Sequence, residues 1–348
     1  MVRRAADGRK AGGMSDHANL PSPAQLRSGS SIDVAIICVT HNSQNVIEDF
    51  ANSIPPAAAD RIYRVCIVDS GSSDGTPESC RRLLPRANLW ELDGNRGFAA
   101  GINLALRRLG GSGDPPRAVV VANPDVRFRA GSIAALLERL DANEQVGVAV
   151  PRLVDEHGLI QLSLRNRPSV AAAWSEAIVG GPLAHRLGMP TEVIRESAMY
   201  ENEVDVGWAT GGLMAISWTC ITEVGYWDES YFLYEEEVDF CERVHNCEFK
   251  VRYCPQATAT RVVGDGGTAP WIQALMRVNR LSHMRRRRTL RAALAMGAAL
   301  LVGDLLRSLV GRTGSRAGAW ALLSGAGVRD VLRRYRPSAE AILSDQRG

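Results

Sequence analysis

The sequence lacks the cysteine patterns that define a disulfide framework or a common metal site. Its seven cysteines include no Cys-x-x-Cys pair, and their odd number does not fit a set of disulfides. Several lie inside apolar runs, as Cys38 and Cys66 do, which is typical of reduced, buried thiols in a cytosolic protein. Zinc at Cys241, Cys247 and Cys254 is disfavoured, because their spacing matches no common zinc motif.

Long apolar runs are also missing. Residues 1–30 lack the apolar core of a signal peptide and are rich in glycine, serine, alanine and arginine, so we expect a disordered leader there. The apolar stretch 290–310 is interrupted by Arg291, Asp304 and Arg307. Because a spanning helix needs about 20 apolar residues with few charges, this stretch does not predict one.

Lysine is absent from the last part of the chain, although that part is strongly basic. Residues 271–348 carry fifteen arginines and four acids, a net charge of +11, which leaves −8 for residues 1–270. Such asymmetry favours an anionic partner. Since no nucleic-acid recognition motif is visible, we expect an amphipathic helix at 290–310 on an anionic membrane surface. The alternative is an ordinary helix packed on the rest of the protein with a solvated basic face.

The first half of the chain alternates strands, polar loops and helices, as an α/β sheet does. Apolar, β-branched runs at 33–39, 63–68 and 118–122 predict strands buried on both faces. Ligands bind outside the carboxyl ends of the strands in such sheets. The polar loop 40–43 and Asp69, which ends the second strand, both fall at that edge.

Two further motifs fall at the same edge. The stretch 95–103 has glycines that allow close backbone approach, and it opens a helix whose N-terminus suits a phosphate, although its spacing is neither a P-loop nor Gly-x-Gly-x-x-Gly. Asn123-Pro124-Asp125 ends another strand, where the Asp125 carboxylate could hold Mg²⁺ or Mn²⁺ together with substrate phosphates. The alternative is a turn without a ligand, because Asn-Pro dipeptides start turns.

The segment 235–239 places four carboxylates within five residues. Mutual repulsion can raise the pKa of one of them, as a general base near neutral pH requires. The alternative is a helix start, where acids offset the positive end of the dipole. Upstream, the strand-like run 204–218 contains the double glycine 211–212, which indicates a bulge or the close approach of a ligand.

These pieces, in this order, resemble a family-2 glycosyltransferase with the GT-A fold. The resemblance runs from Val34 to about Arg261 and rests on six motifs: Thr40–Ser43, Val68–Thr76, Asn95–Asn103, Asn123–Asp125, Gly211-Gly212 and Trp227–Asp239. Within the family, the chain most resembles bacterial rhamnosyltransferases that add L-rhamnose from dTDP-rhamnose to a polyprenyl-diphosphate-linked sugar. The implied fold is an α/β catalytic domain at 31–265, with a mixed sheet flanked by helices. A helical, basic, membrane-associating region would follow at 266–348.

The resemblance implies a role for individual residues. Glu237 would be the catalytic base, with Glu236 as the fallback and Asp239 in support. Asp125 would hold the divalent metal. The donor would contact residues from several loops, namely Thr40, Asn42, Asp69, Asn95, Arg96, Gly97, Asn123, Asp125 and Arg261. The acceptor side would include Trp208, Gly211 and Gly212.

Three positions depart from the family pattern. Asn123 stands where many members have Asp, which removes one charged metal ligand. Glu237 stands where Asp is usual, and a carboxylate displaced by about an ångström can cost about a hundredfold in rate. Arg261 follows Pro255-Gln256-Ala257 near the place of a metal-ligating His in many members, and it could neutralise a diphosphate as a fixed cation. Metal-dependent and metal-independent reactions therefore both stay open.

The sequence thus predicts an inverting glycosyltransferase at the cytoplasmic face of the membrane, which glycosylates a polyprenyl-diphosphate-linked or cell-surface glycan. One base opposite a leaving nucleoside diphosphate supports a single displacement. One alternative is the same fold with a UDP-hexose or UDP-galactofuranose donor. Another is a module that binds a nucleotide sugar without turnover. A sugar-nucleotide pyrophosphorylase is disfavoured, since no glycine-rich Arg-Leu-x-Pro loop follows the first strand.

Overall fold

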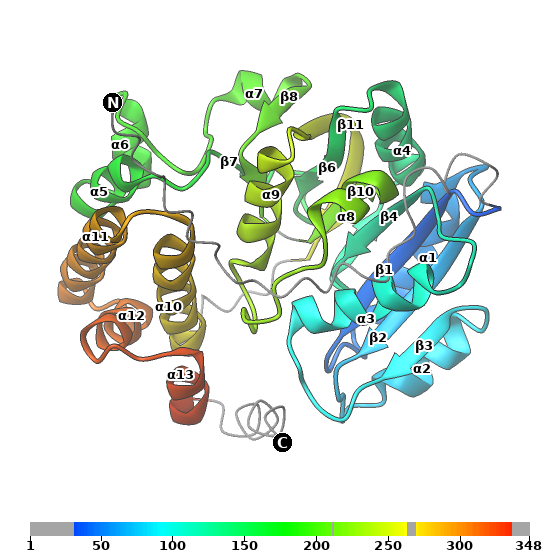
Figure 1. Cartoon of the computed structure of the whole chain (residues 1–348), viewed down its shortest axis with the longest axis horizontal. Coiled ribbons are helices and arrows are strands. Elements are labelled where there is room, and N and C mark those ends of the chain that lie inside the picture. Colours follow the sequence, from blue (N-terminus) through cyan, green and yellow to red (C-terminus); the bar gives the residue numbers. More distant parts are fainter. Residues whose placement is uncertain (1–30, 211, 263–268, 336–348) are drawn as a thin grey trace, which may run out of the picture.

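The computed structural model describes residues 31–210, 212–262 and 269–335. These residues form a mixed sheet covered by helices, with a group of C-terminal helices to one side (Figure 1). The strands are β1 (Val34–Thr40), β2 (Tyr63–Asp69), β3 (Asn88–Glu91), β4 (Ala118–Ala122), β5 (Val126–Phe128), β6 (Val146–Val154), β7 (Leu164–Arg165), β8 (Val204–Val206), β9 (Trp208–Ala209), β10 (Leu213–Ser217) and β11 (Lys250–Arg261). The predicted α/β architecture is confirmed.

The helices fall into two groups along the chain. Those of the sheet domain are α1 (Ile47–Ala58), α2 (Thr76–Leu83), α3 (Phe98–Gly110), α4 (Ser132–Ala142), α5 (Val170–Ile178), α6 (Gly181–Arg186), α7 (Ser197–Glu201), α8 (Trp218–Val224) and α9 (Glu236–Asn246). Those of the C-terminal region are α10 (Pro270–Arg287), α11 (Leu290–Leu309), α12 (Thr313–Leu323) and α13 (Val328–Tyr335).

The main sheet places the predicted loops side by side. Its strand order is β3-β2-β1-β4-β10-β6-β11-β5, with β8 paired to β11. Strands β3, β2, β1 and β4 are parallel, and β10 is antiparallel to both β4 and β6. Thr40 is in register with Asp69, and Cys38 with Ala122, so the segments after β1, β2 and β4 leave the sheet at one edge. This edge is the carboxyl edge of the parallel strands, where ligands bind in α/β sheets.

The central strands are buried on both faces, as their apolar runs predict. Ile36 belongs to the apolar cluster that includes Phe50 of α1 and Leu136 of α4, while the next residue, Ile37, belongs to the cluster that includes Leu106 of α3. Successive side chains of a strand point to opposite faces, so one run of β-branched residues fills both layers. The strands that lead to the carboxyl edge are therefore packed on both faces.

Some elements differ from the sequence prediction. Helix α1 continues to Ala58 through Pro55 and Pro56, although proline disfavours a helix interior. Ile54 and Ala57 on this part of the helix are buried, and their packing outweighs the missing proline N–H groups. The strand-like run 204–218 is divided into β8, β9 and β10.

The C-terminal helices have a small apolar core of their own. Ala274, Leu275, Val331 and Leu332 are buried in it, together with Phe232 from the segment that precedes α9. This shared core joins the C-terminal helices to the sheet domain. The expected domain boundary at 265/266 and the expected leader at 1–30 both lie outside the described residues.

Candidate active site

The first two loops at the carboxyl edge are held together by Asp69. Its Oδ1 accepts hydrogen bonds from Thr40 Oγ1 at 2.8 Å and Ser72 Oγ at 2.6 Å, and its Oδ2 accepts one from Ser72 N at 2.8 Å. Asp69 is 2% exposed. Its carboxylate therefore fixes the shape of the loops that follow β1 and β2.

Asn42 adds a second link between the same loops. Its backbone is left-handed, with φ of 51°, a conformation that asparagine tolerates better than most residues. Its N–H donates to Ser72 Oγ at 2.8 Å, and its Oδ1 accepts from Ser73 N at 2.9 Å. The loop 40–43 is thus pre-shaped before any ligand arrives.

The Asn95–Gly97 segment joins these loops to the acidic stretch. Arg96 N donates to Ser70 Oγ at 3.1 Å, and Asn95 Oδ1 accepts from Gly97 N at 3.0 Å. Gly97 has φ of 89°, and a Cβ there would lie 2.3 Å from the carbonyl oxygen of Phe232. Only glycine allows this approach, which brings the start of α3 against the segment that leads into α9.

A second cluster forms around Asp125, just beyond β4. Its Oδ2 lies 3.3 Å from Nε of Arg261, at the end of β11. Asn123 N donates to the carbonyl of Gly212 at 2.8 Å, and the position of a Cβ on Gly212 would be 3.4 Å from Arg261 Cδ. The structure therefore gathers Asn123, Asp125, Gly212 and Arg261, whereas Gly211 lies outside the described residues.

Asp125 also bears on the question of a metal. Its Oδ1 is buried and accepts no hydrogen bond within the described part of the chain. Mg²⁺ and Mn²⁺ are often held by one or two carboxylates, with substrate phosphates and water completing the shell. No group of three His, Cys, Asp or Glu side chains that could hold a metal occurs among the described residues. Asp125 thus fits a cation shared with a diphosphate, but not a site built from protein ligands alone.

The acidic stretch begins α9, and its first residues have unusual backbones. Tyr234 and Glu235 both have positive φ, 66° and 79°. Such conformations cost roughly 1–3 kcal/mol each and persist only where the surroundings enforce them. They turn the chain so that Glu236 and Glu237 open the helix.

Glu236 and Glu237 differ in exposure. Glu236 is 3% exposed, and its Oε2 has no hydrogen-bond partner among the described residues. Burial raises the pKa of Glu236 well above its ordinary value, and the charge of Glu237 raises it further. Glu237 is half-buried and so more accessible to a ligand.

Tyr234 links this pair to the Asp125 cluster. Burial raises the pKa of its phenol, the positive charge of Arg261 lowers it, and the charges of Glu236, Glu237 and Asp125 raise it. These charges must lie close to the phenol to affect it. The base candidates and the metal candidate therefore belong to one site.

Helix α10 supports the turn before Glu236. The buried Asn279 donates through Nδ2 to the carbonyls of Leu233 at 3.0 Å and Tyr234 at 2.9 Å. Next to it, Arg280 pairs with Glu235 and also with Glu192, at 2.6 and 2.9 Å. Sequence reasoning missed both of these α10 residues.

The same helix pairs with Asp239 and with the acid one turn further along α9. Asp239 is 1% exposed and contacts Arg287 of α10 at 2.7 Å. It also contacts Arg243 of its own helix at 2.9 Å. Glu242 contacts His283 at 2.8 Å and Arg288 at 2.7 Å. Asp239 therefore lies beside the base candidates as a structural group, and its carboxylate is occupied by two arginines.

These contacts involve a run of four arginines, Arg285–Arg288, within the basic region that we expected to meet an anionic membrane. Besides Arg287 and Arg288, Arg286 pairs with Asp228 at 2.7 Å. Three residues of the run thus neutralise acids of the sheet domain. The signal was present in the sequence, since the basic C-terminal region and the acidic remainder complement each other.

Trp208 lies in β9, beside α9. It is 7% exposed, and the Arg165 guanidinium lies 5.7 Å from its ring centre. A backbone group of the next residue, Ala209, bonds the Cys241 thiol, one helical turn after Glu237. Strand β9 therefore borders the helix that carries the base candidates.

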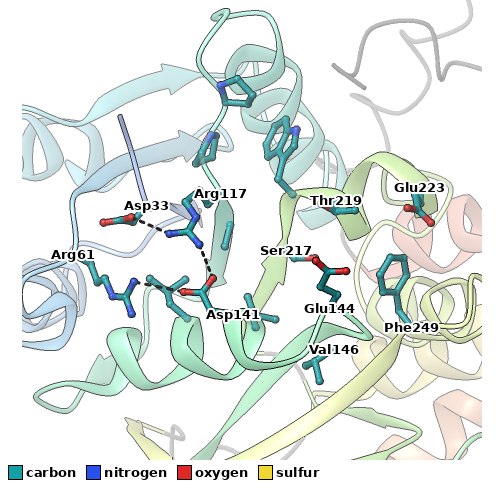
Figure 2. A pocket seen from close by; sticks show the side chains of 16 residues that line it. Asp33, Arg61, Arg117, Asp141, Glu144, Val146, Ser217, Thr219, Glu223 and Phe249 are labelled. Atoms are coloured by element: carbon teal, nitrogen blue, oxygen red, sulfur yellow. Dashed lines mark hydrogen bonds and ion pairs between the residues drawn. The ribbon is translucent and has the colours of Figure 1, made fainter. Parts of the chain in front are cut away.

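A cavity of 530 Å³ lies elsewhere, where β1, β4 and β6 begin (Figure 2). Arg117 pairs there with Asp141 at 2.9 Å and with Asp33 at 3.7 Å, and Arg61 approaches Asp141 at 3.6 Å. These residues hold the amino ends of the strands together. The cavity is at the opposite edge from Asp69 and Asp125, so it is separate from the candidate active site.

The pre-shaped loops and the carboxylates lie at one edge of the sheet, where the sequence predicts the site of a glycosyltransferase. The profile described as Glycosyl transferase family 2 matches residues 35–196. The chain is 31% identical over 228 residues to the N-acetylglucosaminyl-diphospho-decaprenol L-rhamnosyltransferase of Mycobacterium tuberculosis, covering 64% of this chain and 73% of that protein. It is 23% identical over 226 residues to the rhamnosyltransferase WbbL of Escherichia coli, covering 64% and 80%. The chain belongs to glycosyl transferase family 2.

Solved structures agree on the fold. A mannosyltransferase from Pyrobaculum calidifontis, in complex with GDP-Man and Mn²⁺, matches 93% of this chain and 84% of its own, with a TM-score of 0.50 and 16% identity. The structure of GalNAc-T7 with UDP, GalNAc and Mn²⁺ matches 89% of this chain and 57% of its own, with a TM-score of 0.51 and 10% identity. The expected GT-A fold is thereby confirmed.

Proposed function

We propose that the protein transfers L-rhamnose from dTDP-rhamnose to a hydroxyl of a polyprenyl-diphosphate-linked glycan, with inversion at the anomeric carbon. The observation that carries the transferase mechanism is the grouping of Glu236 and Glu237 with Asp125 and Arg261 around Tyr234. The choice of sugar and acceptor is supported by the names of the relatives, which are rhamnosyltransferases and in one case act on a decaprenol diphosphate.

Glu237 is the general base in this proposal. Its carboxylate takes the proton of the acceptor hydroxyl while the oxygen attacks the anomeric carbon, and the bond from that carbon to the diphosphate oxygen breaks. Burial and the charge of Glu237 raise the pKa of Glu236, which makes Glu237 the better candidate for the charged member of the pair. Asp239 fixes the helix through its arginine pairs and takes no proton.

The leaving diphosphate lies beside the ion pair of Asp125 and Arg261. Arg261 offers a guanidinium to the phosphate oxygens, which matches their charge and geometry. Asp125 would hold a divalent cation through Oδ1, with Mg²⁺ and Mn²⁺ equally suited by charge and ligand type. When bound, such a cation would neutralise charge that develops on the diphosphate.

The remaining predicted residues have supporting places in this proposal. The nucleoside lies on the loops that Asp69 joins, with Thr40 and Asn42 on one and Asn95, Arg96 and Gly97 beside the other. Asn123 and Gly212 shape the backbone around Asp125, and Gly211 borders them in sequence. Trp208, on the strand beside α9, lies on the acceptor side.

We also propose that the protein works at the inner face of the membrane. Helix α11 is long and apolar enough to cross a bilayer by length and composition, with a mean hydropathy of 1.6 in its best window. It nevertheless carries the buried Asp304, which pairs with Arg277 of α10 at 2.7 Å and ties α11 to its neighbour. A helix fastened in this way supports a position along the surface.

The exposed side of α11 supplies the apolar face for this contact. Leu290, Leu294, Leu305 and Leu309 are 68%, 60%, 45% and 82% exposed. At about 100° per residue they fall within about 100° of arc, so they share one face. An apolar face of this kind lies in the interfacial region of a bilayer.

Release of nucleoside diphosphate tests the donor and the metal together. The protein is mixed with one donor at a time: dTDP-rhamnose, a UDP-hexose or UDP-galactofuranose. Each mixture is measured with and without a polyprenyl-diphosphate-GlcNAc acceptor, and with and without EDTA. We expect acceptor-dependent, EDTA-sensitive release from dTDP-rhamnose alone. Release from a UDP donor instead would overturn the choice of donor. Release that EDTA does not change would exclude a metal requirement. Arg261 would then neutralise the diphosphate without a cation.

A nucleotide-sugar-binding module without turnover is the second candidate. It is favoured by one observation, that Glu237 is longer by a methylene than the aspartate usual at its position. Saturable donor binding without release, for every donor and acceptor offered, would support the module and contradict the transferase.

A further inference from the structure

A second cavity, of 480 Å³, opens beside the exposed face of α11. It lies between the C-terminal end of that helix and the segment that joins α5 to α6. Part of its wall is apolar and solvent-exposed, at Ile178, Leu306 and Val310. The rest of the lining includes three arginines, namely Arg195, Arg307 and Arg312. A small volume thus combines apolar surface with converging guanidinium groups.

Two of these arginines lack a charge partner. Neither Arg195 nor Arg312 forms an ion pair with any residue that the structure describes, and Arg195 Nε is buried without a hydrogen-bond partner there. The one acid in the lining is Glu176, whose carboxylate accepts from Glu192 N at 2.8 Å. The cavity therefore has an excess of positive charge and at least one donor that is not satisfied by the protein.

Arg307 is only partly neutralised. It donates to the carbonyl oxygen of Glu176 at 2.8 Å, and it lies 4.0 Å from Asp304, which is already engaged by Arg277. Burial lowers the pKa of Arg307, the charges of Arg277 and Arg312 lower it further, and those of Asp304 and Glu176 raise it. An anion in the cavity would relieve this repulsion.

We propose that this cavity binds the phosphate headgroup of an anionic phospholipid in the bilayer. The inference rests on the proposed membrane association, because Leu306 and Val310 of the cavity wall directly follow Leu305 and Leu309 at the same helix end. Guanidinium forks match phosphate oxygens, and the apolar wall would lie against the lipid's glycerol and upper acyl region. Charge and apolarity together fit a lipid phosphate better than a free anion.

The position of the cavity argues against the reacting diphosphate as its ligand. The cavity is built from α5, α6 and α11, whereas the candidate active site lies on α9 and the ends of β4 and β11. Figure 1 shows α10 between α11 and α9. The bound headgroup would set the orientation of the protein on the membrane, with no part in the chemistry.

Binding of the full chain to vesicles tests the proposal. One set of vesicles contains phosphatidylcholine alone, and the other contains phosphatidylcholine with phosphatidylglycerol. The variant Arg195→Gln/Arg312→Gln removes from the cavity two charges that form no ion pair within the described residues. The matched control, Arg285→Gln/Arg291→Gln, removes two exposed arginines at the α10–α11 junction and changes the net charge equally.

We expect the cavity variant to bind phosphatidylglycerol vesicles roughly fifty-fold more weakly than the unmodified protein, against about fivefold or less for the control. Binding to phosphatidylcholine vesicles should be the same for both. Equal losses of vesicle binding in the two variants would mean that the overall positive charge attracts the vesicles. This result would overturn the cavity as the lipid site. Thermal stabilisation by inorganic phosphate that the cavity variant loses, without any preference for phosphatidylglycerol, would overturn the lipid in favour of a free anion.

Failure of the membrane proposal gives a different result. If the unmodified protein binds neither kind of vesicle, and Leu305→Gln/Leu309→Gln changes nothing, the proposed membrane association is wrong. The lipid assignment is then wrong as well. If Leu305→Gln/Leu309→Gln weakens binding to both kinds of vesicle while the cavity variant behaves like its control, only the cavity assignment fails.

Discussion

Helix α9 carries acids on two sides, and their surroundings differ. Toward α10, Glu235, Asp239 and Glu242 each pair with an arginine or a histidine from the C-terminal region. On the other side, Glu236 and Glu237 lie near Tyr234, whose phenol also responds to Asp125 and Arg261. A buried acid with a cation beside it is a structural group. Glu236 is buried, its pKa is raised and it forms no ion pair within the described residues, so it is a candidate for a functional group.

This difference explains why the acidic segment 235–239 fits both interpretations of the sequence, namely a catalytic base and the start of a helix. The first turn of α9 contains three acids, as the helix dipole favours, and one of them is fully occupied by arginines. The other two are placed by a strained turn that Asn279 and Arg280 hold from α10. The C-terminal region is therefore part of the support of the candidate active site.

The largest expected effect is the loss of kcat on substitution of Glu237. Glu237→Gln keeps the shape of the side chain but cannot accept a proton, so we expect kcat to fall by about a thousandfold. Donor binding, measured by calorimetry with the same protein, should stay within about twofold. Glu138→Gln, on the exposed side of α4, is the matched control and should leave kcat unchanged. A full rate in Glu237→Gln would move the base to Glu236.

The second effect is a loss of stability on substitution of Asp239, on the side of α9 that faces α10. Asp239→Asn leaves Arg243 and Arg287 with an uncompensated charge, and we expect the free energy of unfolding to fall by about 3 kcal/mol. Chemical denaturation of both proteins measures the change. The kcat of the folded variant should fall by much less than that of Glu237→Gln. Loss of activity without loss of stability would make Asp239 a functional acid.

The third effect is on the support from α10. Asn279→Ala removes two hydrogen bonds from the turn at Leu233 and Tyr234, so Glu237 should spend less time in its working position. We expect kcat to fall about tenfold, on the scale that small misplacements cost, with the donor KM unchanged. A steady-state comparison with the unmodified protein separates the two constants. A change in KM alone would mean that Asn279 acts on donor binding.

The smallest effect concerns Glu236 and pH. Its pKa in the folded protein is raised, so the native state favours the protonated form, and stability falls as pH rises through that value. Glu236→Gln imitates the protonated form. The variant should gain stability over the unmodified protein with rising pH, by about 1.4 kcal/mol for each unit of pKa shift, and the gain should vanish below pH 4.5. Thermal melts from pH 4 to pH 9 would show a constant difference if Glu236 were charged throughout.

The sequence predicted the strands and their ends well. The apolar, β-branched run before Asp69 ends at that residue in the structure, and β4 ends at Ala122, just before Asn123. Local pattern determines such boundaries, because a parallel strand buried on both faces needs a continuous apolar run. The placement of Asp69 and Asp125 at one edge followed from topology alone.

The support from α10 could not be predicted in the same way. Asn279 contacts Tyr234 from 45 residues away in the sequence, and Arg287 contacts Asp239 from 48 residues away. No local pattern encodes such pairs. Only the opposite charges of the two parts of the chain hinted at them, and we assigned that charge to lipid. Helix α11 is apolar on both its exposed and its buried side, so the expected amphipathic helix on a membrane stays a prediction.

The stereochemistry of the product tests the central claim most directly. The protein is supplied with dTDP-rhamnose and a polyprenyl-diphosphate-GlcNAc acceptor, and the anomeric configuration of the new linkage is read by NMR. A single displacement with Glu237 as base predicts a configuration opposite to that of the donor. Retention of configuration would require a second nucleophile and would contradict the account of this site.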